Sequence, residues 1–214
     1  MTLPQYHGGT LTALKWAAVL LMVGDHVDWL LYGSALGIHD TLGRLVFPVF
    51  GFVLAYNLAR PGAWGRGVHR RLIRRLVLIG TIAAPAYVYL AGLLPANIMF
   101  SLALFVGIAA LLERGRPLLA LLALLACGLF VDYQWPGLVY CLGVWAAYRT
   151  GAPLWLAAAA AGLLGLYVIN GSHAALWALP LLWLASGLRL DLPRHQLAFY
   201  AVYPAHLVVL AVLM

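Results

Sequence analysis

The sequence predicts an all-α fold, a polytopic membrane bundle of about nine transmembrane helices. Of its 214 residues, 65% are hydrophobic and 9% are charged, whereas soluble domains carry about 25% charged residues. The apolar runs lack the strict alternation of outer-membrane barrel strands. Backbone that crosses lipid must satisfy its own hydrogen bonds, which favours helices. We expect residues 1–214 to form a single domain in contact with membrane lipid.

Nine apolar segments follow one another along the chain. A helix needs roughly 20 apolar residues to cross the hydrocarbon core, and several segments are shorter. The weakest are 117–131 and 136–148, for which a re-entrant or half-buried helix is the alternative. Pro136, Pro153, Pro180 and Pro193 mark helix starts and kinks. The predicted helices cover residues 11–33, 42–59, 72–93, 97–112, 117–131, 136–148, 153–169, 174–188 and 196–213.

The basic residues alternate with these segments and predict an orientation. With nine spans, all but one of the 13 lysines and arginines fall on one side, which is cytoplasmic by the positive-inside rule. The N-terminus is then inside and the C-terminus is outside. Only Arg44 falls on the far side. The inner residues are Lys15, Arg60, Arg66, Arg70, Arg71, Arg74, Arg75, Arg114, Arg116, Arg149, Arg189 and Arg194.

Several functions are disfavoured by the sequence. The net charge of +7 follows the spans and forms no soluble basic face, so we expect no nucleic-acid partner. We expect no cleavable signal peptide before the first span. Cys127 and Cys141 lie in apolar segments without metal-ligand spacing, which indicates packing thiols and no metal site. Nucleotide-binding glycine motifs, a nucleophile elbow and a pair of histidines facing each other across helices are not evident.

Asp25 and His26 lie in the middle of the first predicted span. An ionisable side chain at this depth is costly and usually faces protein or a water-filled cavity. Lys15 precedes His26 by eleven residues, and 100° per residue brings it within about 20° of three full turns. Lys15 and His26 therefore share a helix face, roughly 16 Å apart along the axis. The pattern indicates a path from one membrane surface into the protein.

Arg44, near the outer end of the second span, is the expected counter-ion for Asp25 or Asp28, because a buried carboxylate needs a partner. One interpretation is a structural clasp between the first two helices, with His26 as a polar neighbour. The functional interpretation makes His26 a general base at the end of a cavity, since histidine works near neutral pH.

Four arginines cluster at the start of the third span. Their spacing places the guanidinium groups on two neighbouring helical ridges, where a helix N-terminus also presents free N–H groups to a phosphate. The alternative is a purely topological or lipid-headgroup role. The cluster consists of Arg70, Arg71, Arg74 and Arg75.

The last span carries a third set of polar residues. Tyr200, Tyr203 and His206 are spaced by three residues and line one face, and interfacial aromatic belts do not explain the histidine. Asn97 has the position of a helix cap. His173 and Asp132 fall in outer loops, where polar residues are ordinary.

Four stretches of the chain resemble the TraX family, whose members acetylate the amino terminus of conjugative pilin. That family is similar to the acyltransferase-3 superfamily, whose first span carries a basic residue, ten intervening residues and a histidine, and whose third span carries Arg-x-x-Arg. Lys15 and His26 fit the first motif, and Arg71 and Arg74 fit the second. The matching stretches, in order, are Leu14 to His26, Leu42 to Phe52, Asn97 to Leu102 and Phe199 to Leu207.

The resemblance implies an acetyl-CoA-dependent transmembrane acyltransferase in a bacterial inner membrane. Its acceptor would be an amine or hydroxyl on the periplasmic side, foremost the N-terminal amine of a pilin or another envelope peptide. His26 would be the catalytic base, with Asp25 beside it. Cytosolic acetyl-CoA would place its phosphates on Arg70, Arg71, Arg74 and Arg75, assisted by Lys15. Arg44, Asn97, Tyr203 and His206 would support the site.

Two stretches depart from the family pattern, and two rival functions are compatible with the same residues. Residues 55–58 replace an acidic-glycine-aromatic helix end, and 83–87 replace a polar stretch; we expect both to alter the acceptor more than the chemistry. A small proton-coupled transporter could instead use Asp25, His26 and Arg44 as a relay, although no inverted repeat is visible. A non-enzymatic assembly scaffold is the third possibility.

Overall fold

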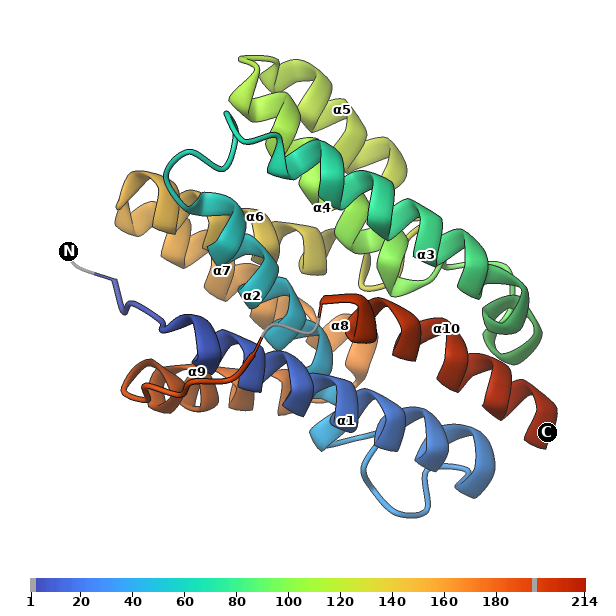
Figure 1. Ribbon diagram of the computed structural model, residues 1–214. Helices are drawn as coiled ribbons and strands as arrows, with labels where there is room; N and C mark the ends of the chain where they lie inside the picture. Colours follow the sequence, from blue (N-terminus) through green and yellow to red (C-terminus); the bar gives the residue numbers. More distant parts are fainter. Residues whose placement is uncertain (1–2, 194–195) are drawn as a thin grey trace.

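The computed structural model describes residues 3–193 and 196–214, and this part of the chain is helical with connecting loops (Figure 1). Each of the nine predicted segments contains a helix, which confirms the all-α class. Arg194, assigned above to the inner side, lies outside the described residues. The helices are α1 (Gly8–Tyr32), the 3-10 turn η1 (Leu42–Leu45), α2 (Val46–Ala59), α3 (Val68–Ala91), α4 (Ile98–Glu113), α5 (Pro117–Cys127), α6 (Gln134–Thr150), α7 (Pro153–Gly165), α8 (Tyr167–Asn170), the 3-10 turn η2 (Ala174–Trp177), α9 (Ala178–Ser186) and α10 (Gln196–Leu213).

Four helical stretches are long and apolar enough to cross a membrane: 8–32, 42–59, 68–91 and 153–170. The remaining apolar helices are shorter. With 11 residues, α5 is about 16 Å long, roughly half of a hydrocarbon core. The apolar helices support a membrane protein, while the number of complete spans and their orientation stay predictions.

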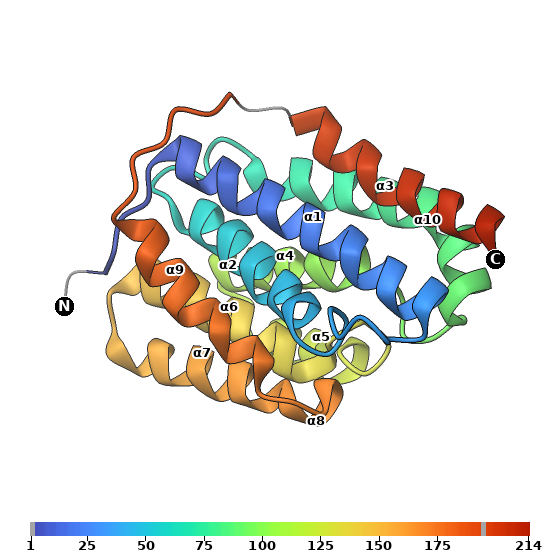
Figure 2. The same cartoon turned by 90° about the horizontal axis from the view of Figure 1, so that it is seen from below.

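Helix α1 begins at one end of the bundle, and α10 ends at the opposite end (Figure 2). Loops that carry arginine gather at the end where α1 begins. There Arg149, at the end of α6, pairs with Glu113 at the end of α4 over 3.0 Å. Arg114 lies over the ring of Trp64, which follows α2. The alternation of basic and non-basic loops in the sequence therefore corresponds to two opposite ends of the molecule.

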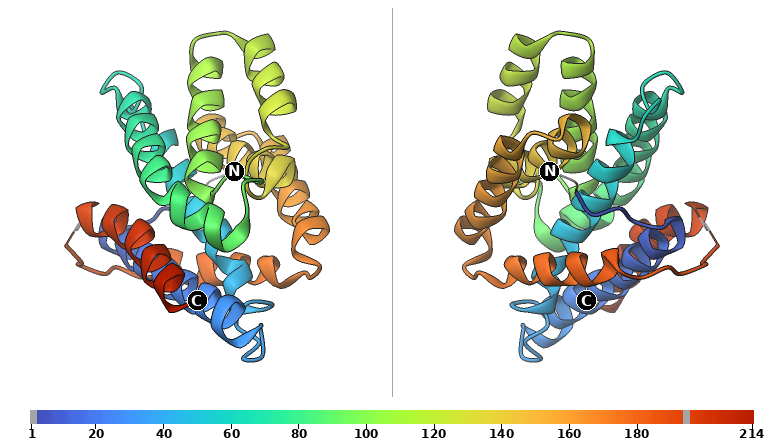
Figure 3. Two further views of the ribbon diagram at one scale, coloured as in Figure 1. Left: turned by 90° about the vertical axis from the view of Figure 1, so that its right-hand side faces the viewer. Right: turned by 90° about the vertical axis from the view of Figure 1, so that its left-hand side faces the viewer.

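Helices α2 and α4 form the centre of the bundle, between two groups of helices (Figures 1 and 3). Helix α2 packs against α1 and α6, and α4 packs against α3 and α5. Phe47 and Leu58 of α2 and Phe105 of α4 are essentially inaccessible to solvent. Helix α10 lies beside α1 and α3, so the first and the last helix of the chain pack side by side.

Glycines let α6 and α7 pack with their backbones in contact. A Cβ atom at Gly143 would lie 2.5 Å from the amide nitrogen of Ala159, and one at Gly162 would lie 2.4 Å from that of Tyr140. Small residues at such positions are typical of helix packing in membranes.

Two helix boundaries differ from the prediction. Helix α3 begins at Val68, four residues before the predicted start, so the arginine cluster lies inside the helix and its direction is set by helical geometry. Helix α5 ends at Cys127, before the predicted end at residue 131. Both cysteines are free; Cys127 is exposed and Cys141 is buried.

Candidate active site

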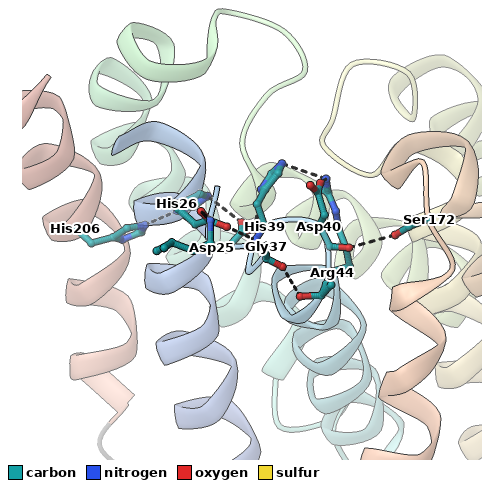
Figure 4. A network of polar contacts seen from close by, with 11 residues as sticks. Asp25, His26, Gly37, His39, Asp40, Arg44, Ser172 and His206 are labelled. Carbon is teal, nitrogen blue, oxygen red and sulfur yellow. Dashed lines mark hydrogen bonds and ion pairs between the residues drawn. The ribbon is translucent and has the colours of Figure 1, made fainter. Parts of the chain in front are cut away.

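A pair of histidines joins α1 to α10 (Figure 4). The Nδ1 atom of His26 lies 2.8 Å from the Nε2 atom of His206. The two rings are nearly parallel, with an angle of 6° between their planes. The sequence did not predict this pair, because the two residues come from opposite ends of the chain and only the packing of α10 on α1 brings them together.

The hydrogen-bond partners assign a tautomer to each histidine. The Nδ1 atom of His206 lies 3.0 Å from the carbonyl oxygen of Val202. A carbonyl oxygen only accepts, so this Nδ1 carries the hydrogen and the Nε2 of neutral His206 is an acceptor. His26 therefore donates from Nδ1, and its Nε2 keeps a free lone pair. With its side chain 19% exposed, His26 presents a basic nitrogen in a largely buried site.

Asp25 is held by His39, a residue of the loop between α1 and η1. Its Oδ1 atom accepts from the Nδ1 of His39 at 2.8 Å, and its Oδ2 atom lies 3.9 Å from the Nε2 of His26. Arg44 donates to the Nε2 of His39 at 3.1 Å. A guanidinium only donates, so His39 must accept at Nε2 and donate from Nδ1 to Asp25. Figure 4 shows this order from Arg44 to Asp25.

The predicted contact of Arg44 with Asp25 or Asp28 is corrected by this arrangement. His39 stands between Arg44 and Asp25, and the ion pair of Arg44 is with Asp40 at 3.5 Å. Asp28 is fully buried and accepts from the backbone N–H groups of Leu36 and His39, at 2.8 and 2.9 Å. Asp28 therefore shapes the loop that delivers His39. The sequence analysis missed His39, since nothing in its local pattern separates it from other loop histidines.

Gly43 in η1 leaves the space that Asp25 occupies. A Cβ atom at this position would lie 2.0 Å from Oδ1 of Asp25, far inside any normal contact. Only glycine allows η1 to approach the carboxylate this closely.

A cavity of about 500 Å³ lies among α1, α2, α3, α4 and α10. Its apolar part reaches Met22 and Tyr203. Met22 is one turn before His26 on α1, and the ring of Tyr203 packs edge-on against His206, with ring centroids 5.6 Å apart. The cavity thus ends about one helical turn short of the histidine pair. Five cationic residues line it near the start of α1: Lys15, Arg60, Arg66, Arg71 and Arg75.

The four clustered arginines do not share one cavity. Arg71 and Arg75 line the main cavity, whereas Arg70 and Arg74 line a second one, of about 430 Å³, between α3 and α4. The division follows the two helical ridges that the sequence predicts, since Arg71 and Arg75 lie on one ridge and Arg70 and Arg74 on the other. The main cavity is also lined by Arg60 and Arg66 of the α2–α3 loop. From the sequence, these two residues were predicted only to lie on the cytoplasmic side.

Lys15 and Asn97, two further residues predicted for the site, make defined contacts. The Nζ atom of Lys15 lies 4.6 Å from the centre of the Phe199 ring, so α10 covers this side of the cavity. Asn97 is structural: its Oδ1 accepts from the Met99 N–H and its Nδ2 donates to the Gly80 carbonyl, which caps α4 and ties it to α3.

Asp132, treated above as an ordinary loop residue, is also close to the polar site. It lies in the loop between α5 and α6, outside the membrane-spanning helices. Burial raises the pKa of its carboxyl to about 7, with a smaller upward contribution from Asp25 and a downward one from Arg44. The hydroxyl of Ser101 donates to its backbone carbonyl at 2.6 Å. Asp132 is therefore a further carboxyl group that interacts electrostatically with Asp25.

A family model described as TraX protein matches residues 10–214. The chain belongs to the TraX family. This membership confirms the resemblance seen in the sequence and suggests a conjugation-associated protein that modifies pilin. No curated protein and no solved structure is significantly similar to the chain. The TraX match includes both histidines and all five cations of the main cavity.

Proposed function

We propose that this TraX-family protein is a transmembrane acyltransferase that moves an acetyl group from cytosolic acetyl-CoA to an acceptor amine or hydroxyl at the periplasmic end. The observation that carries the proposal is the main cavity. Five cationic residues line it near the start of α1. The cavity runs beside α1 towards His26, whose Nε2 has a free lone pair.

The cavity suits a phosphorylated acyl donor. Guanidinium groups pair with phosphate through two parallel hydrogen bonds, and Arg60, Arg66, Arg71 and Arg75 all line this cavity. The deeper part, between Val19, Met22 and Leu102, is apolar and would accept the uncharged arm of the donor. Acetyl-CoA meets both requirements.

The histidine pair supplies the proton transfer. The acceptor nitrogen or oxygen attacks the thioester carbon, and its proton moves to Nε2 of His26. The carbon–sulfur bond then breaks, and the departing thiolate of CoA takes this proton from Nε2 of His26, which restores the base. The imidazolium charge on His26 is shared through Nδ1 with His206 and is countered by the carboxylate of Asp25 at 3.9 Å. A positioned base of this kind contributes about 10² to 10⁴ in rate.

The acceptor is proposed to be the N-terminal amine of a pilin or another envelope peptide, in keeping with the family. The two departures from the family pattern lie in different parts of the molecule. Asn57, in the replaced stretch 55–58, lines the cavity near its cationic mouth. That stretch therefore bears on acyl-donor binding, whereas Tyr87, in the stretch 83–87, is electrostatically close to Asp132 and bears on the acceptor.

The test is release of free thiol from acetyl-CoA by purified protein in detergent, with a short peptide bearing a free amino terminus as acceptor. The same peptide with a blocked amino terminus is the chemical control. His26→Ala is expected to lower the rate by about 10² to 10⁴. His173→Ala is the matched control, because His173 is an exposed loop histidine stacked on Tyr167. Equal rates for wild type and His26→Ala would contradict the proposal.

The rival function is a proton-coupled transporter, favoured by the connected series His206, His26, Asp25, His39 and Arg44. Such a relay would conduct protons in sealed vesicles without acetyl-CoA. We expect no proton uptake above that of protein-free vesicles. Uptake that disappears in His26→Ala, with no thiol release by wild type, would favour the transporter.

A further inference from the structure

His69, in the first turn of α3, is a buried histidine that lacks hydrogen-bond partners. Its residue exposure is 3%, and neither ring nitrogen has a partner within the described part of the chain. A buried polar group without a partner costs about 1–3 kcal/mol. His69 lines the second cavity, between α3 and α4, so a ligand there could satisfy it.

The same cavity is surrounded by positive charge. Arg70 and Arg74 project from successive turns of α3, and Arg114 approaches from the end of α4. The nearby carboxylate of Glu113 is engaged by Arg149 at 3.0 Å. Three guanidinium groups and an imidazole therefore face a cavity of about 430 Å³. This combination calls for an anion with several acceptor oxygens.

We propose that this side cavity binds the phosphate group of an anionic phospholipid. Leu111 and Ile73 supply an apolar part of the lining. Trp64 also lines the cavity and is 38% exposed, and tryptophan is typical of a membrane interface. Seven residues after Arg70, Val77 lies within about 20° of the same helix face; it is 40% exposed and offers a surface for acyl chains. A soluble phosphate would gain nothing from this apolar surface, and the acyl donor has its own cations in the main cavity.

The chain provides a matched pair of variants for the test. R70Q/R74Q removes two charges from the side cavity, and R71Q/R75Q removes two charges from the adjacent ridge of the same helix. Full-length protein in mild detergent is titrated with dioleoyl phosphatidylglycerol or dioleoyl phosphatidylcholine, and bound lipid is counted by native mass spectrometry. Wild type is expected to prefer phosphatidylglycerol. R70Q/R74Q is expected to lose about tenfold or more in that affinity, and R71Q/R75Q to keep it.

His69→Phe gives a second, uncharged test, since it keeps the ring and removes both nitrogens. It is expected to weaken phosphatidylglycerol binding without changing the affinity for CoA. Equal losses in both arginine pairs would show general charge attraction and overturn the proposal. Displacement of the lipid by millimolar inorganic phosphate would point to a free-phosphate site instead. Loss of CoA affinity in R70Q/R74Q, with lipid binding unchanged, would assign the side cavity to the acyl donor.

Discussion

His26 and His206 share a hydrogen bond of 2.8 Å although 180 residues separate them in the sequence. The bond fixes the tautomer of His26, because the backbone carbonyl of Val202 requires a hydrogen on Nδ1 of His206. The free lone pair of His26 is thus set by a residue on another helix. His206 is a positioning residue for the proposed base.

Replacement of His206 should weaken the base without removing it. In His206→Phe, His26 loses its acceptor and can place its hydrogen on either nitrogen, so we expect transfer to fall by about 10 to 100-fold, less than for a lost base. The pH dependence of the rate should also shift, because His26 titrates without its partner. His206→Gln retains an acceptor oxygen and should recover part of the rate. An unchanged rate and pH profile in His206→Phe would contradict this role.

The hydrogen bonds that link Arg44 to Asp25 through His39 should stabilise the fold around Asp25. His39→Ala leaves the carboxylate of Asp25, which is 15% exposed, without its hydrogen-bond donor, and is expected to cost about 2 kcal/mol. Asp25→Asn with His39→Ala should cost less than the sum of the single changes, because the two residues act on each other. Reversible unfolding in mixed micelles measures all three. Strict additivity would show that the two residues are energetically independent.

Gly43 should tolerate no side chain. In Gly43→Ala the new Cβ would lie 2.0 Å from Oδ1 of Asp25, so the carboxylate must move away from His39 and His26. We expect transfer to fall by about tenfold or more, as misplacement of a catalytic group by about 1 Å can cost 10². Gly24→Ala is the control, because its nearest neighbour would be Ile38 at 3.7 Å. Similar activity of the two variants would rule out a packing role for Gly43.

Arg60 and Arg66 should contribute to CoA affinity. Each lines the main cavity, and we expect Arg60→Ala or Arg66→Ala to weaken CoA binding by about threefold to tenfold, with the difference shrinking at high salt because exposed charges are screened. Arg189→Ala is the matched control: this exposed arginine is absent from the cavity lining given by the described residues. Calorimetric titration with CoA measures each affinity, and an equal loss in Arg189→Ala would indicate nonspecific attraction.

The orientation can be tested with a native cysteine. Cys127 is exposed at the end of α5, where the sequence predicts the periplasmic side, and Cys141 is buried. A membrane-impermeant maleimide should label Cys127 in spheroplasts. In a Cys127→Ser background, Arg116→Cys at the opposite end of the bundle should react only in inverted vesicles. The reverse pattern would invert the predicted topology.

The helices and the alternation of basic and apolar stretches are predictable from the sequence, because each depends on short-range composition. Apolar length, proline positions and the placement of arginine between segments are local properties. Asp25 and His26 could be singled out for the same reason, since an ionisable residue in an apolar run is costly wherever the helix packs. Even the two ridges of the arginine cluster follow from the helical repeat alone.

The tertiary structure decided which of these groups meet. His39 reaches Asp25 only because Asp28 and Gly43 shape the loop between α1 and α2, and Arg44 acts through His39 for that reason. The neighbouring helices α10 and α4 determine that Arg71 and Arg75 face one cavity while Arg70 and Arg74 face another. The histidine pair exists because α10 returns to α1. Such contacts depend on the packing of distant segments, which a local pattern leaves undetermined.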